Sequence, residues 1–318
     1  MKTKECPVTF KNRDGLQLFG IVHEPAPDRR TDLAVVLLSP GVKSRVAPHR
    51  LYNKMAAVFV ERGYWVLRFD FYGLGDSEGV VGEQYLADLY ASIQVGRYVG
   101  DTSAAIEWMR DAYGVRRFIL GGLCGGAITG VLAAPSRDDV VGILALGLPV
   151  ILDGPNVDKY RYMTAGQLGQ MRKAYLRKLA AWRAWFRLLT LRSDFRLLAK
   201  AIGSGGGRTS KANDSSEQTA DNTNTLFPPA FLSLLSKARP VLLLFSEMDR
   251  LWWEFEEKFL TRYQATVERH KDLIEIGVIA GANHVLTFES WQADMLARSC
   301  SWLERNFPVA LESKGPSA

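Results

Sequence analysis

The decapeptide Phe118-Ile-Leu-Gly-Gly-Leu-Cys-Gly-Gly-Ala127 decides how this chain of 318 residues is interpreted. Its apolar first half is typical of a buried strand, and the residues that follow it, 125–134, have the pattern of a helix. The core of the stretch, Gly122-Leu-Cys-Gly-Gly126, places a cysteine between glycines at the junction. Glycines are needed where the backbone is strained and where a side chain would collide with a neighbouring element. The stretch therefore predicts a sharp turn between strand and helix, with Cys124 at its tip.

Short apolar runs alternate with longer amphipathic segments on both sides of this turn, which predicts an α/β fold with a mostly parallel central sheet flanked by helices. The runs at 33–38 and 241–245 are almost uninterrupted, as expected of central strands buried on both faces. The expected strands are 16–23, 33–39, 65–70, 118–122, 140–146, 241–245 and 273–279. The expected helices are 49–62, 102–113, 125–134, 252–263 and 289–306.

The alternation stops between residues 153 and 226. The first part of this stretch has apolar residues at three- and four-residue steps, which predicts an amphipathic helical cap. Residues 156–201 hold eleven Lys and Arg against two Asp, so this cap is basic. The polar, Gly- and Ser-rich tract after it has the composition of a flexible loop. We therefore expect a core formed by 1–152 and 227–311, an inserted basic cap at 153–226, and a disordered tail at 312–318.

Four further motifs follow expected strands in a fixed order. They are Leu38-Ser-Pro-Gly-Val42, Asp70-Phe-Tyr-Gly-Leu-Gly-Asp-Ser77, Phe245-Ser-Glu-Met-Asp249 and Gly281-Ala-Asn-His284. Together with the Gly-x-Cys-x-Gly turn, they make the chain resemble the α/β-hydrolase superfamily over nearly everything except the cap. The resemblance implies the α/β-hydrolase fold, with Cys124 in the position of the usual serine nucleophile. The segments 44–50 and 67–70 and the Gly-Leu-Cys turn are also similar to hydrolases encoded beside the exosortase A system in bacterial polysaccharide loci.

The chain order of nucleophile, acid and histidine in this fold is that of Cys124, Asp249 and His284. We expect His284 to take the thiol proton or to hold a preformed thiolate, while Asp249 fixes the orientation of its ring. The backbone N–H groups of Gly125 and of Val42, or of a neighbour of Val42, would form an oxyanion hole.

Other residues have less specific signals. Glu247 is an alternative acid, although its spacing fits less well. Asp70 and Ser77 are expected to shape their own loop. His49 is either a helix-cap residue or a substrate contact. The remaining cysteines, Cys6 and Cys300, have no catalytic neighbours in sequence and are expected to be structural or incidental.

Three function classes fit these residues. The first is an acyl hydrolase, acting as an esterase or thioesterase through an acyl-cysteine intermediate, and the second is an acyltransferase that uses the same cysteine. The third is an inactive binding module that has kept the fold. Cysteine favours activated acyl donors such as thioesters, because an acyl-cysteine is itself a thioester. Arg183 and Arg187 in the basic cap are candidate contacts for coenzyme A or an acidic acyl carrier protein, and the same charge also suits an anionic membrane surface.

Composition excludes several other classes. The three cysteines and four histidines show no metal-ligand spacing, so neither a metal nor another cofactor is expected. No nucleic-acid partner is expected either. The start of the chain is polar, and no run approaches the roughly 20 apolar residues of a membrane span. The sequence therefore predicts a cytoplasmic protein without a transmembrane segment.

Overall fold

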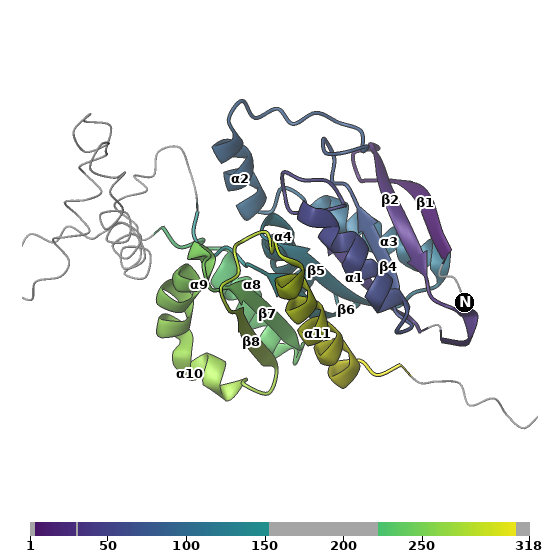
Figure 1. The fold of residues 1–318 in the computed structure, drawn as a ribbon. Coiled ribbons are helices and arrows are strands. Elements are labelled where there is room, and N and C mark those ends of the chain that lie inside the picture. Colours follow the sequence, from purple (N-terminus) through teal and green to yellow (C-terminus); the bar gives the residue numbers. More distant parts are fainter. Residues whose placement is uncertain (1–3, 30, 153–221, 310–318) are drawn as a thin grey trace, which may run out of the picture. The chain divides into compact units, whose positions relative to one another are not determined.

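The computed structural model describes residues 4–29, 31–152 and 222–309. Within these residues the centre of the fold is one eight-stranded sheet, in the order β1-β2-β4-β3-β5-β6-β7-β8 (Figure 1). Strands β1 and β2 run antiparallel to their neighbours, and the pairs from β4 through β8 are all parallel. The strands are β1 (Lys4–Lys11), β2 (Gln17–Glu24), β3 (Leu33–Leu38), β4 (Trp65–Phe69), β5 (Arg117–Leu123), β6 (Val140–Leu146), β7 (Val241–Ser246) and β8 (Ile274–Ile279).

Helices cover both faces of this sheet, which confirms the predicted fold class (Figure 1). Helices α1 (Leu51–Val60) and α11 (Glu289–Asn306) share one apolar core with one face of the strands. The opposite core takes side chains from the other helices. These are α2 (Leu86–Gln94), α3 (Val99–Tyr113), α4 (Gly125–Ala133), α8 (Phe227–Ser236), α9 (Arg250–Phe255) and α10 (Thr261–Arg269).

Buried apolar runs locate the central strands as expected. Every residue of β3 and β7 is buried, in agreement with their nearly uninterrupted apolar sequences. The expected single helix at 252–263 instead begins at Arg250 and continues through a π-helical turn at Glu256–Leu260 into α10. Its earlier start has a local cause, because the Asp249 carboxylate accepts the N–H of Leu251 and caps the first turn.

Three elements were not predicted. Strand β1 is a mostly exposed edge strand with Phe10 as its one buried residue, and the alternation of Cys6, Val8 and Phe10 that marks its inner face was missed. Helix α2 buries only Leu89, Ile93 and Gln94. Helix α8 begins at Phe227 and has two prolines directly after it, which suggest a turn in sequence but fit the first helical turn, where the N–H groups have no helical partners.

The parallel strands set up the functional edge of the sheet. Since β5, β7 and β8 run in the same direction, the segments that follow them begin at the same edge. An isolated antiparallel bridge pairs Ile151, which follows β6, with Thr223, which precedes α8. The predicted cap lies almost entirely outside the described residues and stays a prediction. Among the described helices, none is both long and apolar enough to cross a membrane.

Candidate active site

Cys124 lies in the strained turn that the sequence predicted. Its φ of 53° and ψ of −111° are unusual for a residue with a side chain, and its N–H donates to the carbonyl of Leu146 at 2.9 Å. The glycines on either side are required by close packing. A Cβ on Gly122 would lie 2.5 Å from the carbonyl carbon of Gly126, and one on Gly126 would lie 2.2 Å from the carbonyl oxygen of Leu38. Helix α4 therefore begins directly against the end of β3.

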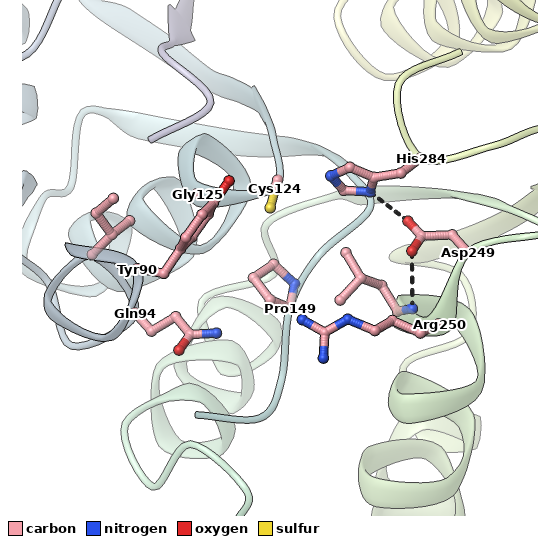
Figure 2. A pocket seen from close by; sticks show the side chains of 10 residues that line it. Tyr90, Gln94, Cys124, Gly125, Pro149, Asp249, Arg250 and His284 are labelled. Carbon is pink, nitrogen blue, oxygen red and sulfur yellow. Dashed lines mark hydrogen bonds and ion pairs between the residues drawn. The ribbon is translucent and has the colours of Figure 1, made fainter. Parts of the chain in front are cut away.

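The segments after β7 and β8 bring an acid and a histidine to the same place. The Nδ1–H of His284 donates to Oδ2 of Asp249 at 2.5 Å, and the other carboxylate oxygen accepts the N–H of Leu251 at 3.4 Å (Figure 2). Asp249 is only 7% exposed, so this carboxylate is held by two partners away from bulk water. The structure thus brings Cys124, His284 and Asp249 together, in the order expected from the sequence.

The electrostatic balance at His284 favours the imidazolium. Burial lowers the pKa of His284, but hydrogen bonds to Asp249 and to Cys124, together with their negative charges, raise it to about 10. With Nδ1 directed at Asp249, the opposite edge of the ring faces the sulfur (Figure 2). The geometry thus places a ring that favours its protonated form in hydrogen-bond contact with the Cys124 sulfur.

The alternative acid, Glu247, has a different partner. Its Oε2 accepts the N–H of Gly281 at 2.7 Å, so it links the segment after β7 to the turn that carries His284. A backbone bond from Met248 N–H to the carbonyl of Ala282, at 2.9 Å, ties the same two segments together. Glu247 therefore fixes the turn that leads to His284, whereas Asp249 binds the imidazole ring of His284.

The two expected contributors to the oxyanion hole have unequal support. Gly125 is the first residue of α4, where helical geometry leaves its N–H without an intrahelical acceptor, and it lines the pocket beside Cys124. A Cβ on Gly125 would lie 3.0 Å from the Cα of Gly41, so the loop after β3 packs directly against it. Val42 follows Gly41 in that loop and is half-buried, but it does not line the pocket.

The loop after β4 has the shaping role expected of it. Asp70 is fully buried, accepts the N–H of Arg45 at 2.5 Å and forms an ion pair with the Arg45 guanidinium. The Ser77 hydroxyl donates to the carbonyl of Asp70 at 2.7 Å and accepts the N–H of Phe19 at 2.8 Å. Because Arg45 lies shortly after Val42, Asp70 also anchors the loop after β3.

Of the substrate contacts expected outside Cys124, His284 and Asp249, only His49 lies within the described residues. His49 is exposed in the 3₁₀ turn Pro48–Arg50, with a φ of 54°, and does not line the pocket. Arg183 and Arg187 lie outside the described residues, so their role stays a prediction.

A pocket of 370 Å³ opens at Cys124. Its lining includes residues that sequence reasoning missed: Tyr90, Ile93 and Gln94 from α2, Pro149 from the segment after β6, and Arg250 and Leu251 from α9. Tyr90, Ile93 and Gln94 were missed because helix α2, which carries them, was not predicted. Arg250 could have been found, since it directly follows the expected acid in sequence.

Sequence reasoning also missed Tyr52, which lies beneath the turn. Its side chain is fully buried, and its hydroxyl donates to the carbonyl of Leu38 and accepts the N–H of Leu123, each at 2.7 Å. The ladder between β3 and β5 ends with the pair Leu38 and Gly122, so the hydroxyl bridges the strands where direct pairing stops. Burial raises the pKa of Tyr52, which keeps the bridging proton in place.

Comparison with known proteins identifies the architecture. No protein-family model matches the sequence, and no curated protein matches it. Among solved structures, an esterase from Pyrococcus furiosus is similar over 95% of this chain and 91% of its own, with 19% identity and a TM-score of 0.55. An α/β serine hydrolase without a lid from Xanthomonas campestris is similar over 98% of both chains, with 15% identity and a TM-score of 0.53.

The chain has the α/β-hydrolase fold. A further similar structure, the α/β hydrolase GrgF from a Penicillium species, covers 95% of this chain and 98% of its own, with 17% identity and a TM-score of 0.53. At these identities the likeness establishes the fold, and the chemistry has to be argued from the site.

Replacing Asp249 by Asn is expected to lower the pKa of His284 well below 10, because the strongest interaction that favours the imidazolium is weakened. Titration of the His284 ring by NMR measures this directly. The same interaction stabilises the folded chain below the unfolded pKa of about 6.5, and that contribution is lost as pH rises towards 10. Glu247→Gln is the matched control and should leave the midpoint of the His284 titration near its parent value. An unchanged midpoint in Asp249→Asn would contradict the assigned hydrogen bond.

Replacing Tyr52 by Phe is expected to leave the Leu123 N–H and the Leu38 carbonyl buried and unpaired, at a cost of about 1 to 3 kcal/mol in the free energy of unfolding. It should also change the alkylation rate of Cys124, measured by mass spectrometry of the peptide that contains it.

Tyr64→Phe is the matched control, since the Tyr64 hydroxyl donates to the carbonyl of Phe307 at 2.9 Å and does not contact the turn. It should lower stability without altering Cys124 reactivity. Equal alkylation rates in both variants and the parent would show that Tyr52 supports the fold but not the turn.

Proposed function

We propose that this α/β-hydrolase-fold protein is an acyl hydrolase that acts through an acyl-cysteine intermediate on Cys124. The observation that carries the proposal is the position of His284, which lies between the Cys124 sulfur and the buried Asp249 carboxylate at the edge of a pocket. An inactive binding module has no need for a strained cysteine, an oriented imidazole and a buried acid in one chain of contacts. The geometry therefore favours an enzyme.

The reaction follows from these contacts. The Cys124 thiolate attacks the acyl carbon, and the N–H of Gly125 is placed to stabilise the oxyanion. The tetrahedral intermediate expels the leaving group, which takes the proton of His284. The imidazole then accepts a proton from water as that water attacks the acyl-cysteine. Collapse then breaks the bond from the acyl carbon to sulfur, which releases the carboxylic acid and the Cys124 thiolate beside the protonated imidazole.

The nucleophile points to activated donors. Because acyl-cysteine is a thioester, its formation from another thioester is nearly isoenergetic, whereas its formation from an alkyl ester is uphill. The acyl-cysteine also keeps enough energy to react with an amine or a hydroxyl, so an acyltransferase is the second candidate. Hydrolysis comes first in this proposal because it needs no second binding site, and the His284 side chain, 36% exposed, is open to water.

The sequence resemblance of segments 44–50 and 67–70 and of the Gly-Leu-Cys turn suggests a biological setting for the proposed reaction. Similarity to hydrolases encoded beside the exosortase A system supports a role in acyl chemistry linked to bacterial polysaccharide assembly. Steering of a carrier by Arg183 and Arg187, contact of the basic segment with a membrane, and a cytoplasmic location remain proposals from the sequence.

Incubation with thioester and activated-ester donors is expected to add one acyl group to Cys124, detectable by intact-protein and peptide mass spectrometry. Cys124→Ala and His284→Ala should each lower turnover by roughly 10,000-fold, and the double variant should lose little more, because the groups act as a unit. Acylation at Cys6 or Cys300, or substantial turnover in either single variant, would overturn the proposal.

Cys124→Ser is expected to hydrolyse thioesters more slowly than the parent. A serine hydroxyl has to lose its proton during attack, whereas a thiolate beside an imidazolium is already deprotonated. Steady-state rates on one thioester and its oxygen-ester analogue test this. Cys6→Ser is the matched control, because Cys6 lies in the edge strand β1 and should not affect turnover. A serine variant as fast as the parent on thioesters would remove any special role for the thiol.

A further inference from the structure

One face of helix α2 forms a wall of the pocket beside Cys124, and the proposed mechanism does not use it. Ile93 and Gln94 stand three and four residues after Tyr90, which places all of these pocket residues on one side of the helix. Figure 2 shows Tyr90 and Gln94 on one side of the pocket and His284 on the other. An acyl group on Cys124 therefore has α2 on one side and the histidine on the other.

Ile93 packs against both segments that are expected to form the oxyanion hole. It is fully buried. A Cβ on Gly41, in the loop after β3, would lie 3.0 Å from its Cδ1, and a Cβ on Gly125 would lie 3.1 Å from its Cγ2. Both distances are shorter than an ordinary contact between carbon atoms, about 3.5 to 4.0 Å. The branched side chain of Ile93 therefore fills the space that the two glycines leave.

Hydrogen bonds at the residue after Ile93 hold this wall in place. The Gln94 side-chain amide donates to the carbonyl of Ile151 at 2.7 Å, and the Asn224 side-chain amide donates to the carbonyl of Gln94 at 2.7 Å. The backbone N–H of Asn224 donates to the carbonyl of Val150 at 2.8 Å. Gln94 and Asn224 are both buried, and buried hydrogen bonds are expensive to break. Ile93 is thus part of a rigid wall that does not withdraw from a bulky substrate group.

We propose that Ile93 is a specificity-determining residue that selects acyl donors unbranched at the carbon next to the carbonyl. This inference rests on the proposed function and names its substrate class. The carbonyl carbon has to bond to the Cys124 sulfur while its oxygen reaches the N–H of Gly125. The carbon next to it then lies in the part of the pocket that Ile93 lines. A hydrogen atom on that carbon fits beside Ile93, whereas a methyl branch collides with it.

The test compares kcat/KM for the butyryl and isobutyryl thioesters of N-acetylcysteamine, which are isomers with the same leaving group. A short acyl group suits a pocket of 370 Å³, which is at the small end of ligand sites. The parent is expected to prefer butyryl more strongly than N-acetylcysteine does in thioester exchange with the same donors, a comparison that removes their difference in intrinsic reactivity. Ile93→Ala should lower the butyryl-to-isobutyryl ratio by about 10- to 200-fold, the range for one carbon in an apolar pocket. Ile93→Val should lower it by less, because only one methyl group is removed.

Leu89→Ala is the matched control. Leu89 stands four residues before Ile93 on α2 and is buried in the apolar core, but it does not line the pocket. Its truncation loosens the packing of the helix without opening space beside Gly125, so its butyryl-to-isobutyryl ratio should equal that of the parent. Thermal unfolding shows whether each variant is folded. If Ile93→Ala does not fold, the ratio of Ile93→Val decides the test, because this smaller change disturbs the core least.

Three results would overturn the inference. The first is a parent that does not use the butyryl donor, or prefers it no more than N-acetylcysteine does, and the second is an unchanged ratio in the folded Ile93 variants. The third is an equal change of the ratio in Leu89→Ala, because the selectivity would then come from the packing of α2 as a whole. In each case other donors still acylate Cys124, so the proposed function stands. Absence of acylation by every donor would overturn the proposed function and this inference with it.

Discussion

The close approach of α4 to the end of β3 is the constraint on which the site depends. Gly126 leaves no room for even a methyl group beside the carbonyl of Leu38, and a Cβ on Gly125 would lie 3.0 Å from the Cα of Gly41. This contact forces the chain to turn within one residue and places Cys124 in a backbone conformation that side chains rarely adopt. It also brings the first N–H of α4 next to the loop after β3. One packing contact thus holds Cys124, the proposed nucleophile, in its strained turn and assembles the surroundings of the proposed oxyanion hole.

The same contact opens a gap in the sheet, which Tyr52 fills. Where β3 and β5 separate, the N–H of Leu123 and the carbonyl of Leu38 would both be buried without a partner. A buried unpaired backbone group costs as much as a lost hydrogen bond. The Tyr52 hydroxyl satisfies both groups, so α1 supports the turn from the face of the sheet opposite α4.

The sequence predicted the parts of this site whose signals are local. The apolar runs of β3 and β7 located central strands, and the glycines around Cys124 located the turn. The pairing of Asp249 with His284 was expected from chain order, because parallel strands end at one edge. Tyr52 and Gln94 could not be found in this way, since their partners are backbone groups far away in sequence, at Leu123 and Ile151. Helix α2 was missed although Leu86, Leu89, Tyr90 and Ile93 follow a helical spacing, because the segment is short and Leu86 is exposed.

The charges around His284 also explain how one imidazole serves both halves of the proposed reaction. Before acylation, the negative charges of Cys124 and Asp249 raise the pKa of His284, so the ring is protonated and ready to supply the leaving group. Once the sulfur carries the acyl group, its negative charge and its hydrogen bond to the ring are both gone. Burial then opposes protonation with only Asp249 left to offset it, and the pKa of His284 falls. The ring that acted as an acid towards the leaving group is thereby converted into a base for water, at the step that needs one.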